Sequence, residues 1–111
     1  LFGKMGKVML VGEKEIPACM ALASCGIAYA MRYARANMEG AIELGIKPVK
    51  ALEIIEQTMI GAARLLEKSG NHPEAEIDKV TTPGGLTIKG INALEENGFT
   101  TAVVKALRAS V

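Results

Sequence analysis

The sequence predicts an all-α domain that pairs with a second copy of itself. Apolar residues recur at three- and four-residue steps through residues 27–44 and again through 48–68, which is the spacing of amphipathic helices. Half of the 111 residues are apolar but only four are aromatic, so the core must be aliphatic. A chain of this length buries only about two thirds of its surface when it folds alone. The high apolar content therefore favours an oligomer.

The first expected elements are short. Lys7–Val11 is an apolar run between glycines and predicts a strand. A lone strand is not stable in water, so it pairs with a partner chain or belongs to a sheet outside this sequence. A short helix is expected over 13–22, with Pro17 near its start, where a missing N–H costs little. The small residues of 23–26 suit a bend or a close backbone approach.

Two long helices are expected over 27–44 and 48–68. Gly45 suits the position just past the first helix, and Pro48 suits the start of the second. One apolar stripe runs along the second helix: Val49, Leu52, Ile55, Met59, Ala62, Ala63 and Leu66. Further apolar residues widen this stripe until little of the circumference is polar, and such a helix is buried on most sides. Because a small domain rarely buries one helix so fully, we expect an intertwined homodimer.

Three shorter helices complete the prediction. Gly70 closes the second long helix, and Asn97-Gly98 separates the last two helices. The final helix is expected to be N-capped by Phe99 or Thr100. The three helices cover residues 73–80, 87–96 and 100–109.

Composition excludes several classes of function. The net charge is +1 and the basic residues are scattered, so no nucleic-acid partner is expected. Charged residues interrupt every apolar run before the roughly 20 residues that a membrane span needs. Cys19, Cys25 and the single histidine, His72, fit no metal-ligand spacing, and two free thiols indicate a reducing compartment such as the cytoplasm. The first residues, Leu1-Phe2-Gly3-Lys4, lack the basic start and apolar stretch of a signal peptide. The chain begins with Leu rather than Met, so it is expected to be a piece of a longer protein.

The stretch Val80–Gly90 departs from the helical pattern, with Pro-Gly-Gly between threonines. Backbone N–H groups at the start of the next helix could bind an anion such as a carboxylate, with Thr82 and Thr87 adding hydroxyls. The same residues also suit a plain connector, with Thr82 as N-cap and Pro83 as the first helical residue. Spacing alone leaves both interpretations open.

Two motifs, at residues 80–88 and 93–99, closely resemble the signature of pyrroline-5-carboxylate reductases. Residues 80–88 match a pattern of Val, two Thr or Ser, and then P-G-G-x-T-I, and residues 93–99 match A-L-E-x-x-G-F. Residues 57–63 resemble the family's Q-T-x-x-G-A-A helix, and residues 69–73 resemble its S-G-x-H-P turn. The resemblance covers essentially the whole chain.

The resemblance implies an enzyme that reduces 1-pyrroline-5-carboxylate to L-proline with NADPH or NADH. Residues 1–14 would be the last strand and linker of a missing Rossmann domain, and residues 15–111 the helical dimerisation and substrate-binding domain. The sequence has no G-x-G-x-x-G, so the cofactor would be held mainly by the missing part. The fragment alone is therefore expected to be inactive. Family dimers interlock through the two long helices, and some assemble into larger rings.

The resemblance also implies a substrate site. The substrate carboxylate would lie on the backbone N–H groups of Gly85 and Leu86, in the loop that contains Gly84, with the Thr82 hydroxyl beside them. Thr87 would be the catalytic residue, holding the ring nitrogen by a hydrogen bond while solvent supplies the proton. Val80 is the candidate for a cofactor contact within this chain.

The chain departs from the family before the first long helix. Ala23–Ile27 stands where the family has Ser-Gly-Ser-Gly-Pro, Pro17 and Met20 replace an Asp and a Thr, and Leu86 replaces Ala or Thr. These changes keep open a diverged or non-catalytic relative that serves assembly or acts on another imine acid. An unrelated helical interaction module is a third hypothesis.

Overall fold

The computed structural model describes residues 10–111, and every regular element in that range is helical. The all-α prediction is confirmed. The strand expected over 7–11 falls mostly outside the described residues, and Leu10 and Val11 form neither strand nor helix. The elements are, in order, a 3-10 turn (Glu13–Glu15), α1 (Ile16–Met20), a π-helical turn (Ala21–Cys25), α2 (Gly26–Glu43), α3 (Pro48–Ser69), α4 (Pro73–Lys79), α5 (Leu86–Glu96) and α6 (Phe99–Ala109).

The chain divides into two compact units. The first combines Leu1–Arg35 with Thr100–Val111, and the second is Ala36–Phe99. The boundary falls inside α2, so this helix contributes residues to both units. The substrate loop expected from the sequence belongs wholly to the second unit.

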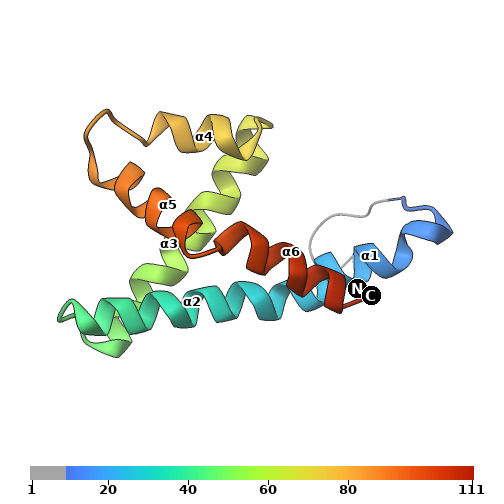
Figure 1. Ribbon diagram of the computed structural model, residues 1–111, viewed down its shortest axis with the longest axis horizontal. Helices are drawn as coiled ribbons and strands as arrows, with labels where there is room; N and C mark the ends of the chain where they lie inside the picture. The colour runs from blue at the N-terminus through green and yellow to red at the C-terminus, as the bar shows by residue number, and fades with distance from the viewer. Residues whose placement is uncertain (1–9) are drawn as a thin grey trace. The chain divides into compact units, whose positions relative to one another are not determined.

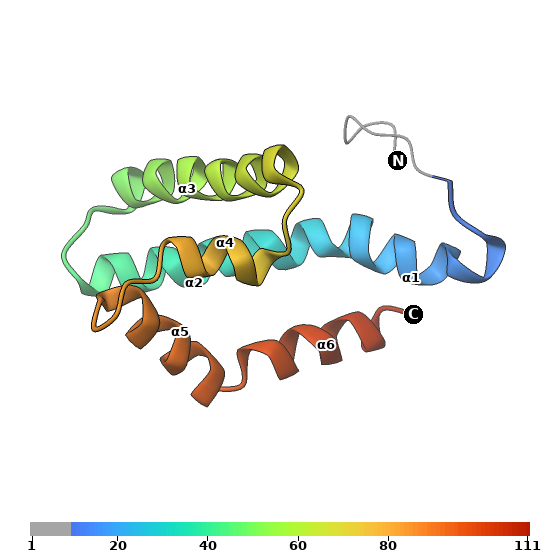
Figure 2. The same cartoon turned by 90° about the horizontal axis from the view of Figure 1, so that it is seen from above.

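Residues 23–26, which suit a bend or a close backbone approach in the sequence, lie within a continuous helical stretch of the first unit. The N–H of Gly26 donates to the carbonyl oxygen of Ala21, five residues back, and the helix runs on into α2 (Figures 1 and 2). This is a π-helical turn, which takes one extra residue into a helix without ending it. The run of small residues therefore marks a widened turn, and the buried Ala21 lies at its start.

Tyr29 joins the two chain segments of the first unit. Its hydroxyl shares a hydrogen bond with the hydroxyl of Ser110 and lies 3.4 Å from the carbonyl oxygen of Ala106. The Ser110 hydroxyl in turn donates to Ala106 at 2.8 Å. These contacts fasten the last turn of α6 to α2, and they give Tyr29 a structural role.

Removing this hydroxyl should loosen α6. We expect Tyr29→Phe to destabilise the first unit by about 1 kcal/mol, because a half-buried hydrogen bond typically contributes that much. Hydrogen exchange of the α6 amides should be faster in the variant. A double-mutant cycle with Ser110→Ala provides the control, since both variants break the same contact. Fully additive effects of the two substitutions would contradict a direct interaction.

The second unit is built on α3. Pro48 is its first residue, as expected, and the N–H of Gly70 closes it by donating to Leu66 at 3.0 Å. The chain then turns back into α4, which contacts α3 (Figure 1). Helix boundaries differ from the expected ones by one residue at most ends. α6 begins at Phe99, so Phe99 is helical rather than the N-cap, and the Thr100 alternative is also wrong.

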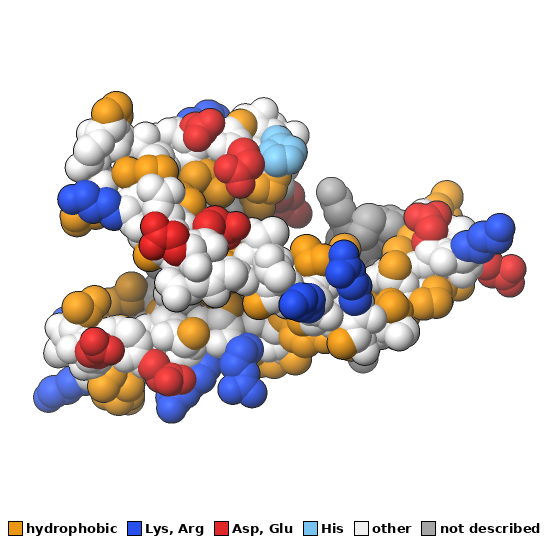
Figure 3. Space-filling model, in the orientation of Figure 1, with side chains coloured by type: hydrophobic (Ala, Val, Ile, Leu, Met, Phe, Trp, Pro, Cys, Tyr) orange, Lys and Arg blue, Asp and Glu red, His pale blue; other side chains and the backbone are white. Residues whose placement is uncertain are grey.

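Much of the apolar surface of α3 is exposed within one chain. Among the described residues, the buried apolar side chains are Ala21 and Ala51, whereas Ile54 is 49% exposed and Leu65 is 53% exposed. Figure 3 shows further apolar side chains lying open among the charged ones. Surfaces of this kind mark sites of association. Across residues 10–111, no helix combines the length and the apolar content needed to cross a membrane.

Candidate functional site

The loop between α4 and α5 contains a tight turn. The N–H of Gly85 donates to the carbonyl oxygen of Thr82 at 2.9 Å, so residues 82–85 close a four-residue turn. Pro83 takes its second position, and Gly84 takes the third with φ of 73°. This is the arrangement of a type II turn, in which the third position favours glycine because its φ is positive. The turn brings the chain directly to the start of α5.

Gly85 is the N-cap of α5. Its backbone is extended, with φ of −76° and ψ of 176°, and it has no side chain to cap the helix. A Cβ at this position would overlap the Thr82 hydroxyl and lie 3.1 Å from the Thr82 carbonyl oxygen. The assignment of Thr82 as N-cap and Pro83 as first helical residue is wrong, because Gly85 is the N-cap and the helix begins at Leu86.

The first turn of α5 presents backbone donors to solvent. Leu86 is 85% exposed and Thr87 is exposed beside it. N–H groups at the start of a helix have no carbonyl four residues earlier within the helix, and they carry the positive end of its dipole. The Gly85 N–H, by contrast, is occupied by Thr82. The available donors therefore begin at Leu86, one residue later than the sequence indicated.

The remaining predicted residues lie on the same loop. Thr82 places its hydroxyl against Gly85, at the entrance to α5. Val80 is the C-cap of α4 and is exposed, with the turn between it and Thr87. The structure thus gathers the expected substrate residues at one helix end. It places Val80 at the other side of the turn.

His72 caps the helix that leads into this loop. Its Nδ1 accepts a hydrogen bond from the N–H of Glu74 at 3.1 Å, and Pro73 is the first residue of α4. The sequence indicated only a turn residue here. Histidine can accept through Nδ1 only when that nitrogen carries no proton. The signal that could have shown the cap is its place directly before a proline that starts a helix.

Glu76 makes side-chain contacts at both ends of the same helix. Its Oε2 accepts from Nδ2 of Asn71 at 3.0 Å and lies 2.9 Å from Nζ of Lys79. The hydrogen bond from Asn71, followed by the one from Lys79, lowers the pKa of Glu76 below its ordinary value of 4.5. The carboxylate therefore links the turn before α4 to its last residue.

This lowered pKa predicts an acid-sensitive α4. Between its lowered pKa and 4.5, Glu76 binds fewer protons in the folded than in the unfolded state, so stability falls as the pH drops through that window. The contribution is complete above 4.5 and lost below the lowered value. NMR signals of the α4 amides should report this loss. The variant Glu76→Gln should abolish the dependence, and an unchanged acid transition in that variant would contradict the role of Glu76.

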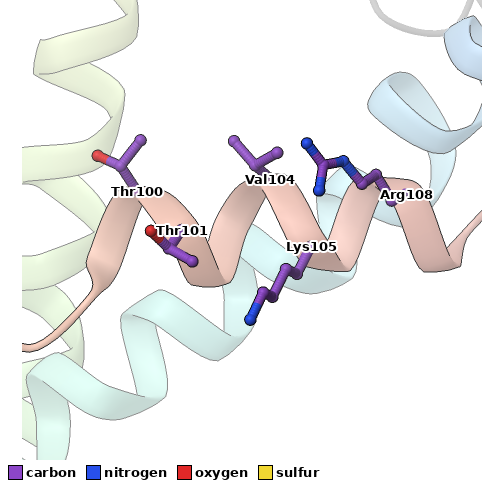
Figure 4. Close-up of a pocket in the computed structure, with 5 residues that line it drawn as sticks. All are labelled: Thr100, Thr101, Val104, Lys105 and Arg108. Carbon is purple, nitrogen blue, oxygen red and sulfur yellow. The ribbon is translucent and has the colours of Figure 1, made fainter.

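Other candidate sites in the described chain carry no comparable arrangement. Residues 10–111 contain no group of three or more His, Cys, Asp or Glu residues that could hold a metal ion. Cys19 and Cys25 are both free and half-buried. A hollow is lined by Thr100, Thr101, Val104, Lys105 and Arg108, all on α6. Figure 4 shows Lys105 pointing away from Arg108, so the two cations do not converge on one ligand.

Comparison with known protein families decides the identity of the domain. A family model for pyrroline-5-carboxylate reductase dimerisation matches residues 13–111. The chain belongs to this family. The resemblance seen in the loop and in the α5 motif is confirmed, and the hypothesis of an unrelated helical interaction module is wrong. The family's name indicates self-association, in agreement with the exposed apolar surface of α3.

Individual proteins that are similar to this chain carry names that agree with the family match. Pyrroline-5-carboxylate reductase 1 of Dictyostelium discoideum is 43% identical over 99% of this chain, which covers 20% of that protein. The pyrroline-5-carboxylate reductase of Arabidopsis thaliana is 36% identical over 99% of this chain, which covers 40% of it. The chain thus spans between one fifth and two fifths of these relatives.

Solved structures share the fold of this family. The 1-pyrroline-5-carboxylate reductase of Streptococcus pyogenes matches 92% of this chain and 39% of its own, with a TM-score of 0.89 and 34% identity. The pyrroline carboxylate reductase of Plasmodium falciparum, solved with NADP bound, matches 90% of this chain and 38% of its own, with a TM-score of 0.86 and 26% identity.

Proposed function

We propose that this chain is the dimerisation and substrate-binding part of a longer pyrroline-5-carboxylate reductase. The whole enzyme would reduce 1-pyrroline-5-carboxylate to L-proline with NADPH or NADH. The family match over residues 13–111 and the names of the relatives support this proposal. The division of residues into a linker (1–14) and a functional domain (15–111) belongs to the same proposal.

The observation that carries the proposal is the uncapped start of α5. Gly85 provides no side chain to satisfy the helix, and the turn before it leaves the first helical residues exposed. A carboxylate would accept hydrogen bonds from the N–H groups of Leu86 and Thr87, in the positive field of the helix end. Gly84 and Gly85 would let the ligand approach the backbone closely. The Thr82 hydroxyl, against Gly85, would lie at the edge of this site.

Thr87 would act on the ring of the same substrate. Thr87 is the second residue of α5, so its hydroxyl lies at the same helix end that would hold the carboxylate. It would hydrogen-bond the ring nitrogen and hold the C=N bond in place. A Thr hydroxyl is a poor acid, so the nitrogen would take its proton from solvent while Thr87 provides orientation.

The cofactor would be held mainly by another part of the protein. The chain has no Gly-x-Gly-x-x-Gly to cradle its phosphates, so the described residues do not by themselves fit the whole group. The nicotinamide, when bound, supplies the hydride for the reduction. Val80, exposed at the end of α4, is the residue that could contact it from this chain.

The chain would associate with a second copy of itself as an obligate homodimer. The long helices α2 and α3 would interlock with those of the partner, because α3 leaves Ile54 and Leu65 exposed in one chain. Such dimers could also build larger assemblies. The two free cysteines suit a reducing compartment, so we propose a cytoplasmic enzyme.

An activity assay tests the proposed reaction. The full-length protein that carries this chain should oxidise NADPH or NADH when 1-pyrroline-5-carboxylate is added, and L-proline should accumulate. The 111-residue chain alone should be inactive. Absence of turnover in a full-length protein that still binds its cofactor would exclude the proposed reaction.

The role of Thr87 gives a sharper test. Thr87→Val should lower kcat/KM roughly tenfold, the effect of removing a hydrogen bond that is made in the transition state. Thr87→Ser keeps the hydroxyl and should retain most of the activity. Steady-state kinetics of both variants provide the measurement. Equal activity of Thr87→Val and the unmodified enzyme would remove Thr87 from the mechanism.

The second candidate is a diverged relative that serves assembly or acts on another imine acid. The altered residues of Ala23–Ile27 favour it, and three of these residues lie in the π-helical turn. Restoring the family's residues, by Ala23→Ser, Ser24→Gly, Cys25→Ser and Ile27→Pro together, should then create or raise activity. A restored protein no more active than its parent would count against this candidate.

A further inference from the structure

Thr81 has a hydrogen bond that the proposed reaction does not use. Its Oγ1 donates to the carbonyl oxygen of Ile77 at 2.6 Å, and its N–H donates to Asp78 at 3.2 Å. The residue is half-buried, whereas Thr82 and Thr87 are exposed. Thr81 is thus bonded through both backbone and side chain to the last turn of α4. It is the residue directly before the tight turn of the substrate loop.

The helix to which Thr81 is bonded is itself held at both ends. His72 caps its start, and Glu76 accepts from Asn71 before the helix and from Lys79 at its end. Because both ends of α4 are held by side-chain contacts, the helix limits the movement of the loop that follows it. The Thr81 hydroxyl therefore fixes the direction in which the chain leaves α4.

A continuous set of contacts runs from that support to the start of α5. The next residue after Thr81 is Thr82, whose carbonyl oxygen accepts the N–H of Gly85 and whose hydroxyl lies against Gly85. Gly85 is followed at once by the helix. A change in the direction of the chain at Thr81 is therefore carried through a tight turn into the first turn of α5.

We infer that Thr81 is a positioning residue that aims the start of α5 at the substrate carboxylate. The inference rests on the proposed function, because it assigns the positioned helix end to that carboxylate. Thr81 acts only through the loop: its hydroxyl is bonded to Ile77, so the residue supports the site rather than contacting substrate.

The variant Thr81→Val isolates the hydroxyl. Valine has the shape of threonine, and the Ile77 carbonyl keeps the N–H of Val80 as a donor at 3.1 Å, so no buried acceptor is left without a partner. In the full-length enzyme we expect the KM for 1-pyrroline-5-carboxylate to rise roughly fivefold, the size of one lost hydrogen bond. The kcat should also fall, because Thr87 lies in the same first turn of α5. The KM for the cofactor should change less than about twofold, because the cofactor would be held mainly by another part of the protein.

Two further variants complete the experiment. Thr81→Ser retains the hydroxyl and should restore the KM. Thr101→Val makes the same substitution on α6, outside the loop, and should leave the KM unchanged. An unaltered KM in Thr81→Val, or a KM that Thr81→Ser does not restore, would overturn the inference.

Hydrogen exchange of the full-length protein separates this inference from the proposed function. Thr81→Val should speed exchange of the amides of residues 82–88, and Thr101→Val should not. If the unmodified enzyme shows no turnover, the proposed function fails, and exchange then decides the role of Thr81 in the loop. Equal exchange in Thr81→Val and the unmodified protein would overturn that role as well.

Discussion

Gly85→Ala should lower kcat/KM of the full-length reductase by at least about a hundredfold. A methyl group at this position would overlap the Thr82 hydroxyl and lie 3.1 Å from the Thr82 carbonyl oxygen. The Thr82 hydroxyl must therefore rotate away and its carbonyl oxygen must shift by a few tenths of an ångström, which moves the N–H groups of Leu86 and Thr87 from the proposed carboxylate site. Two charge-assisted hydrogen bonds of about 1.5–3 kcal/mol each account for an effect of this size.

Gly90→Ala provides the matched control for this loss. Gly90 lies in the same helix, and a Cβ there would meet no atom within 4 Å. This variant should stabilise α5 by about 0.5–1 kcal/mol, because alanine is the better helix former, and should leave kcat/KM unchanged. Thermal melts followed by circular dichroism confirm that both variants fold. A folded Gly85→Ala enzyme with unchanged kcat/KM would contradict the proposed site.

The long helices could be predicted closely from the sequence because proline and glycine mark their ends. Pro48 starts α3 and Gly70 follows its last residue, as expected, since each satisfies or avoids the unpaired backbone groups of a helix end. The three- and four-residue spacing of apolar residues predicted that these elements are α-helices. It also indicated that one chain could not cover α3 fully, and Ile54 and Leu65 are about half exposed there.

The π-helical turn could not be predicted. The small residues of 23–26 fit a bend, a close approach or a widened turn equally well, and hydrogen bonding over five residues leaves no distinct apolar period. The His72 cap was missed for a related reason. Ser, Thr, Asp and Asn are the usual caps, so histidine before Pro73 indicated only a turn.

The candidate site was predicted as a set of residues but not as a set of atoms. The motif of residues 80–88 singled out Thr82, the two glycines and Thr87, and the structure gathers them at one helix start. Which N–H groups are available depends on the turn. Because Gly85 donates to Thr82, the donors begin at Leu86 instead.

The second large effect concerns the α3 surface, where we expect Leu65→Lys to dissociate the proposed dimer. Leu65 and Ile54 are about half exposed in one chain, and eleven residues, about three helical turns, place them on the same side of α3. Gly61 lies between them, and a Cβ there would meet no atom within 4 Å, so a partner helix has room to approach. An unpaired charge buried in this contact should raise the dimer dissociation constant at least about a hundredfold.

Glu67→Lys is the control, because it places the same charge two residues away on a side of α3 that is already polar. Sedimentation velocity at micromolar concentration should show monomers for Leu65→Lys and dimers for Glu67→Lys. Loss of the dimer should also lower the thermal stability of Leu65→Lys, since so little of the chain is buried without a partner. A Leu65→Lys protein that remains a dimer of unchanged stability would place the interface on another surface. The apolar side of α3 would then need a different explanation.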